Sequence, residues 1–285
     1  MKQFQTLFDK YIFNEDSDPF NMPYSIAINC FLDDFSEKNK DNNVEIPIFR
    51  QILEHENWLY EPRGKMIGEI DIYEYGHLVY PQINEYYIPS WVEGDSCKFG
   101  DFTARSIVVI TNSRVFEIMK NADIYKLLNA IIVYTVGIPR FTVRRFIHLL
   151  KCHTHLPVFC LVDNDTWGYF SYSVLQRGCL APHKRYEFNA IPNCHFLGLN
   201  AVQAEKCVSN GCPTSRWKPI WTKRIKALSL YDCFSSKKWQ NEFKRFNKHG
   251  YAVDLDQALQ YSGFDWIVDE INTITECLSD NFEKT

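Results

Sequence analysis

Two acidic residues, Asp163 and Asp165, follow the apolar run 156–162, and Gly168 and a helix-like segment come after them. A buried strand that delivers two carboxylates to its carboxyl end is a common way to hold a divalent cation beside a phosphate. The same residues also fit an Asx turn with Asp165 as the N-cap of the next helix, and the motif alone favours this simpler interpretation. The surrounding sequence therefore has to decide between the two.

From residue 106 onward the chain alternates between apolar, strand-like runs and amphipathic, helix-like segments. The apolar runs lack the polar alternation of a half-exposed strand, which predicts a parallel sheet covered on both faces by helices. We expect strands over residues 107–110, 130–134 and 158–162, and helices over 115–128, 141–151 and from 169 onward. Ligands bind at the carboxyl ends of such strands, where Thr111, Gly137 and Asp163 are placed.

The composition restricts the kind of protein this can be. The 285 residues are 46% hydrophobic and carry a formal net charge of −4, which excludes a disordered chain and argues against a purely electrostatic coat for nucleic acid. No run reaches the length of a membrane span, and the ten cysteines include no C-x-x-C pair, so we expect a reduced, intracellular protein without a membrane segment. Three basic clusters favour a phosphate ligand: residues 140–151, 216–226 and 237–248.

The order of several short motifs resembles a known family. The matching segments keep both their order and their spacing, which makes the set more specific than any single motif. They are residues 62–68, 108–111, 136–146, 156–168, 196–199 and 238–271. Together they resemble the Toprim domain of the topoisomerase VI A-subunit and of its eukaryotic relative, the protein that makes meiotic DNA double-strand breaks.

The resemblance implies an α/β fold, with a Toprim-like Rossmannoid parallel sheet and a short, mostly helical winged-helix remnant before it. Residues 1–57 would form the shortened winged-helix-like region, and residues 58–105 a strand-rich linker region. The Toprim domain with its C-terminal helices would cover residues 106–271, followed by a tail over residues 272–285.

The resemblance also implies a chemistry. In that family a tyrosine hydroxyl attacks a DNA phosphodiester and leaves a 5′-phosphotyrosyl link, so we expect a type IIB topoisomerase-like isomerase that cleaves duplex DNA. Magnesium held by Toprim carboxylates positions the scissile phosphate. Two chains act together, which implies a homodimer, and the further partner would be an ATPase B-type subunit. The resemblance places the protein in the nucleus, where it would initiate meiotic recombination.

Matching positions assign roles to particular residues. Asp163 and Asp165 take the positions of metal ligands, and Gly168 matches the glycine that lets the chain turn into the next helix. Arg144 matches a family arginine and is expected to contact a phosphate. Arg63 and Lys65 lie in the basic, glycine-containing segment before the Toprim domain and are expected to contact DNA.

Two other positions bear on activity. Thr111 stands where the family has its first metal-binding glutamate, and a hydroxyl is a poor replacement for an anionic ligand, so a weakened magnesium site is expected. Glu117 lies nearly two helical turns further on and is badly placed to replace it. Tyr24 lies 40 positions before Gly64, near the spacing of the family's nucleophile, and is the candidate for that role.

Two alternatives stay open. A catalytically degenerate relative, which binds DNA or dimerises without cleaving, is favoured by Thr111 and by the short N-terminus, and it predicts duplex binding that is indifferent to magnesium. A phosphohydrolase or nucleotide-binding enzyme is disfavoured because no glycine-rich loop follows the strand expected over residues 107–110.

Overall fold

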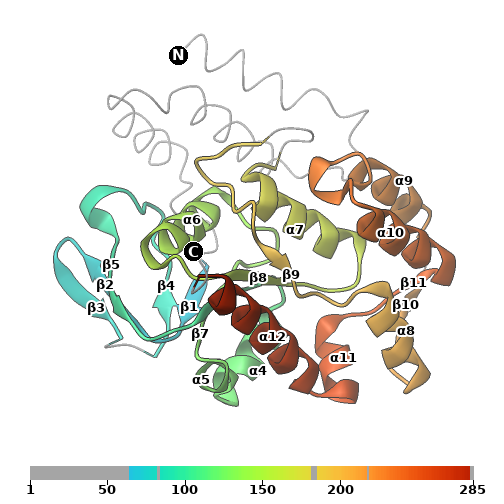
Figure 1. Cartoon of the computed structure of the whole chain (residues 1–285), viewed down its shortest axis with the longest axis horizontal. Helices are drawn as coiled ribbons and strands as arrows, with labels where there is room; N and C mark the ends of the chain where they lie inside the picture. The colour runs from blue at the N-terminus through green and yellow to red at the C-terminus, as the bar shows by residue number, and fades with distance from the viewer. Residues whose placement is uncertain (1–63, 82–83, 181–184, 217, 283–285) are drawn as a thin grey trace, which may run out of the picture.

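The computed structural model of the chain describes residues 64–81, 84–180, 185–216 and 218–282 (Figure 1). Its centre is a six-stranded sheet in the order β4-β1-β7-β6-β8-β9. Four strands run parallel: β6 (Ser106–Ile110), β7 (Ala130–Tyr134), β8 (Val158–Leu161) and β9 (His195–Phe196). The predicted α/β class with a parallel sheet is confirmed. The sheet continues with β1 (Lys65–Ile67) and β4 (Tyr86–Tyr87), which pair antiparallel.

The central strands are apolar on both sides because helices cover both faces of the sheet. Alternate residues of β6 enter two different cores, Ile107 and Val109 on one face and Val108 and Ile110 on the other. Helices α6 (Phe141–Thr154) and α7 (Thr166–Arg177) pack on the first face. The second face is covered by four helices, α4 (Ser113–Asn121), α8 (Ala201–Ser209), α11 (Leu255–Ser262) and α12 (Asp265–Phe282).

Helix α6 ends at Thr154, three residues after its predicted end, and two other expected helices also differ from their prediction. The helix expected over 115–128 is two helices, α4 and α5 (Ile124–Leu127), because Asp123 adopts a left-handed φ of 53° between them. Helix α7 begins at Thr166, three residues before the predicted start, because the Asp165 carboxylate caps it. The N-cap interpretation of Asp165 is thus confirmed.

The remaining elements surround the sheet. A three-stranded antiparallel sheet has the order β3-β2-β5, and a two-stranded one pairs β10 with β11. These strands are β2 (Ile70–Glu74), β3 (His77–Tyr80), β5 (Lys98–Phe102), β10 (Ser215–Arg216) and β11 (Tyr251–Ala252). Helices α9 (Pro219–Leu228) and α10 (Lys237–His249) lie beside α7, and the short turns are η2 (Gly94–Ser96) and η3 (Asp232–Phe234). The strand-rich region predicted over 58–105 therefore contributes both to the small sheet and to the central one.

Some sequence predictions lie outside the described residues. They include the winged-helix-like region over 1–57, the candidate nucleophile Tyr24 and the basic residue Arg63. Within the described part of the chain, no helix has the length and apolar character needed to cross a membrane.

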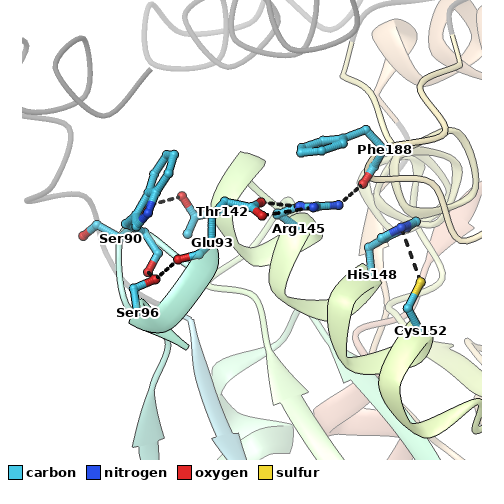
Figure 2. A network of polar contacts seen from close by, with 9 residues as sticks. Ser90, Glu93, Ser96, Thr142, Arg145, His148, Cys152 and Phe188 are labelled. Atoms are coloured by element: carbon cyan, nitrogen blue, oxygen red, sulfur yellow. Dashed lines mark hydrogen bonds and ion pairs between the residues drawn. The ribbon is translucent and has the colours of Figure 1, made fainter. Parts of the chain in front are cut away.

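Arg145 of α6 joins three separate segments (Figure 2). Its Nε and Nη2 donate to the two carboxylate oxygens of Glu93, the second at 3.1 Å, and its Nη1 donates to the Phe188 carbonyl at 2.8 Å. The guanidinium also lies 3.5 Å from the centroid of the Phe188 ring. Since both partners of the ion pair are largely buried, this arginine acts as a structural clamp between α6, the turn before η2 and the loop before β9.

Replacing Arg145 with alanine is expected to lower the free energy of unfolding by about 2 kcal/mol, because the Glu93 carboxylate would stay partly buried without its partner. Urea unfolding followed by circular dichroism measures this loss. Arg105→Ala is the matched control, since Arg105 is exposed and should change stability by less than about 0.5 kcal/mol. Equal stabilities for the two variants would show that the clamp contributes nothing.

Candidate functional site

The ends of three parallel strands meet at one edge of the central sheet. Thr111 follows β6, Gly137 follows β7 and Asp163 follows β8. The Gly137 backbone N–H donates to the Thr111 carbonyl at 3.3 Å, and the Asn112 side-chain Nδ2 donates to Asp163 Oδ1 at 3.2 Å. The expected meeting of these loops at the carboxyl edge is therefore seen directly.

Asp163 is a partly buried carboxylate with an unusual proton affinity. The Leu255 backbone N–H donates to its Oδ1 at 2.7 Å, which ties the start of α11 to the end of β8. Burial and the nearby negative charge of Asp165 raise the pKa of Asp163 to about 7, and the bonds from Leu255 and Asn112 only partly oppose this rise. The ionised form of Asp163 is therefore disfavoured in the folded protein.

Asp165 caps a helix, and this role does not exclude the predicted role in binding a metal. Its Oδ1 accepts from the Gly168 N–H at 2.6 Å and so caps α7, where the helix dipole also favours an anion. Burial, and secondarily repulsion by Asp254, nevertheless raise the pKa of Asp165 above its usual value, while Arg224 opposes the rise. An N-cap carboxylate keeps further oxygen lone pairs, so capping leaves it able to bind a cation.

Gly168 is required here for space rather than for backbone flexibility. It lies in the first turn of α7, and it is absent from the described glycines with positive φ. A Cβ at this position would overlap the Asp163 carbonyl oxygen and lie 3.2 Å from the carbonyl carbon. The motif correctly predicted that the fold needs a glycine at this position. The expected reason, a turn that needs the conformational freedom of glycine, is wrong.

The two described cations expected to contact DNA are engaged within the protein. Lys65 of β1 forms ion pairs with Glu85 at 3.0 Å and Glu117 at 3.9 Å, and its side chain is 25% exposed. Arg144 of α6 is fully buried, and its Nη1 donates to the Pro139 carbonyl at 2.6 Å. Their contacts to DNA stay predictions, and Arg144 would have to leave a buried position to make one.

Three residues near the motif were missed by sequence reasoning. Asn112 caps α4 and also holds Asp163, so its position before a helix was a readable signal. Asp254 precedes α11 and adds negative charge near both motif carboxylates. Arg224 of α9 places its guanidinium 4.3 Å from the Trp167 ring centroid and its Nη1 3.4 Å from Thr166 Oγ1. The last two approach from distant parts of the chain, and no local pattern links them to the motif.

Comparison with known families supplies the decisive observation. The family model for the Toprim domain of the topoisomerase 6 A-subunit and Spo11 matches residues 106–271. The chain belongs to this family. The match covers more than half of the chain and includes β6, β7, β8 and the D-x-D motif.

The chain is also similar to archaeal proteins named as the A-subunit of type 2 DNA topoisomerase 6. It is 26% identical to that of Sulfurisphaera tokodaii over 83% of this chain and 65% of the relative. It is 25% identical to that of Saccharolobus shibatae over 80% of this chain and 62% of the relative. It is 26% identical to that of Hyperthermus butylicus over 79% of this chain and 61% of the relative. The chain thus spans less than two thirds of the length of these topoisomerase proteins.

The donor set of this Toprim site fits magnesium only in part. Among the described residues, no group of three or more His, Cys, Asp or Glu side chains is arranged to hold a metal ion. Magnesium usually keeps several waters and binds through one or two carboxylates together with substrate phosphates. Asp163 and Asp165 supply such a pair, and their pKa values are raised chiefly by burial, which disfavours the ionised carboxylates and which a bound cation would offset. The pair fits a magnesium ion whose coordination is completed by a phosphate.

Proposed function

We propose that this chain is a DNA-binding, topoisomerase VI A-subunit-like protein that breaks duplex DNA by tyrosine transesterification. The observation that carries the proposal is the pair Asp163 and Asp165, two partly buried carboxylates with raised pKa values at the carboxyl edge of a Toprim sheet. The named relatives are components of DNA topoisomerases, which supports the same chemistry.

In this proposal each group of the chain has a defined task. The hydroxyl of Tyr24 attacks the phosphorus and forms the phosphotyrosyl ester, while the bond from phosphorus to the 3′ oxygen breaks and that oxygen takes up a proton. Asn112 and the Leu255 N–H orient the Asp163 carboxylate. Magnesium, when bound, would neutralise the charge that develops on the phosphate.

The assembly and setting extend the same proposal. A homodimer on duplex DNA would supply two tyrosines for a double-strand break, and the further partner would be an ATPase B-type subunit. The resemblance to the eukaryotic break-forming relative supports the nucleus as the location and the start of meiotic recombination as the process.

A covalent-adduct assay tests the cleavage step. The full chain, with and without a B-type ATPase partner, is incubated with labelled duplex DNA and magnesium, then denatured and separated on a gel. We expect label to stay with the wild-type protein and to be lost in Tyr24→Phe and in Asp163→Ala. Tyr75→Phe is the control, since Tyr75 is an exposed tyrosine far from the D-x-D in sequence. An adduct that survives in Tyr24→Phe would show that another residue is the nucleophile.

The catalytically degenerate relative is the second candidate, and two observations favour it. Thr111 offers a neutral hydroxyl where the family has a carboxylate, and the Asn112 amide already donates to Asp163. This candidate predicts duplex binding that is unchanged by a chelator, and no adduct under any condition. Magnesium-dependent label on the protein would reject it. The phosphohydrolase alternative loses its basis because the chain belongs to the topoisomerase family.

A further inference from the structure

The charges of this chain are strongly segregated along the sequence. Residues 215–249 contain ten lysines and arginines but two acids, Asp232 and Glu242. The other 250 residues therefore hold 21 of the 31 basic residues and 33 of the 35 acidic ones. An acidic protein with one segment of net charge +8 has a local electrostatic field opposite in sign to that of the rest of the chain.

The structure gathers this charge on two neighbouring helices. Helices α9 and α10 lie beside one another and beside α7 (Figure 1). The ring centroids of Trp221 on α9 and Phe246 on α10 are 6.2 Å apart. On α10, Phe243 and Phe246 face the core, and the spacing of Lys237, Lys244 and Lys248 places them together on the opposite side.

On α9, Trp221 and Ile225 are buried and Lys223 and Lys226 are exposed. Because about 100° separates successive residues of a helix, these two lysines also point away from the buried side. We define the α9–α10 basic surface as these two lysines and the three of α10: Lys223, Lys226, Lys237, Lys244 and Lys248.

Within the described residues none of the five forms an ion pair, whereas Arg245, also on α10, is held by Glu205 at 2.7 Å. The single acid of α10, Glu242, accepts from Tyr169 Oη and from the Ala201 N–H, both at 2.7 Å, and so faces inward. Helix α9 carries no acid at all.

We propose that the α9–α10 basic surface binds the phosphate backbone of duplex DNA. The proposal rests on the proposed DNA-binding function and adds a contact region that lies outside the D-x-D motif. Helix α9 also borders the motif, because its Arg224 contacts Thr166, the residue directly after Asp165. A linear polyanion matches separated lysines that are spread over two neighbouring helices.

The test is duplex binding by the full chain at several salt concentrations, in chelator so that metal binding contributes nothing. The variant replaces Lys223, Lys244 and Lys248 with glutamine. Its matched control, Lys98→Gln, Arg105→Gln and Lys126→Gln, removes three exposed charges elsewhere. We expect the surface variant to bind about tenfold more weakly or worse, with a salt slope smaller by about 3, because each lysine that neutralises a phosphate contributes about 0.9 to that slope. The control should bind like the wild type.

Each other outcome overturns the inference in a recognisable way. If the wild type binds DNA and the surface variant binds equally well with the same salt slope, the surface is not a DNA contact, while the proposed function stands. If the wild type fails to bind DNA, the proposed function itself fails. Loss of binding to phosphatidylserine vesicles in the surface variant, without a change in DNA binding, would assign the lysines to a lipid surface instead. Circular dichroism of both variants confirms that each is folded.

Discussion

Asp163→Asn is expected to stabilise the metal-free protein by about 2–4 kcal/mol above about pH 8, although it removes a residue proposed to act in function. The reason is that folding places the Asp163 carboxylate where burial and Asp165 raise its pKa to about 7, well above its value in the unfolded chain. Asparagine keeps an oxygen that accepts from the Leu255 N–H but carries no charge. The substitution therefore removes the cost and keeps the contact.

The direction of the pH dependence follows from which state binds the proton more tightly. Below about pH 4 the carboxyl is protonated in both states, so wild type and variant should be equally stable with respect to this group. As the pH rises toward 7 the unfolded chain releases its proton first, and the folded wild type becomes progressively less stable. Urea unfolding across this range, in chelator, should show the gap between the two proteins opening and then levelling off.

Magnesium should oppose the loss of wild-type stability that a rise in pH causes. A cation that binds only the folded, ionised pair stabilises the protein by mass action, so magnesium should raise the wild-type melting temperature at high pH and leave Asp163→Asn unchanged. Asp101→Asn, a change at an exposed strand residue, is the control and should follow the wild type throughout. A wild-type stability that is flat from about pH 4 to 8 would show that Asp163 carries no such charge penalty.

The features of this site that depend on residues close together in the sequence could be predicted. Unbroken apolar runs predicted β6, β7 and β8, and the residues that follow them do lie together at the carboxyl edge. Asp165 could be recognised as a helix cap because capping depends on a neighbour three residues away. Position after a strand and spacing before a helix were sufficient for both results.

The contacts that set the chemistry of the site could not be predicted in this way. Asp163 is held by Asn112, 51 residues earlier, and by Leu255, 92 residues later. Its pKa is raised chiefly by burial, which arises only when the chain is folded. For Arg144 the local pattern was misleading. Its place in a basic cluster suggested a contact with a phosphate, whereas the fold buries its side chain completely. Charge along a helix does not show which side faces the core, and only the packing of α6 decides it.

Gly168→Ala is expected to lower the free energy of unfolding by about 3 kcal/mol or more, although alanine is normally the better helix former by about 1 kcal/mol. The new Cβ would overlap the Asp163 carbonyl oxygen and lie 3.2 Å and 3.3 Å from the carbonyl carbon and nitrogen of that residue. These are backbone atoms that cannot rotate away, so α7 and the end of β8 would have to separate.

The matched control is Gly250→Ala at the end of α10, where a Cβ meets no atom within 4 Å but φ is +69°. Its cost should be only about 1–2 kcal/mol, the usual strain of an alanine in the left-handed region. Urea unfolding of both variants separates crowding from backbone strain. Since Gly168 fixes the distance between the Asp163 backbone and the α7 cap, Gly168→Ala should also weaken the stabilisation by magnesium at high pH. A variant as stable as the wild type would mean that α7 does not close on Asp163 in this way, and the pairing of the two carboxylates would lose its structural basis.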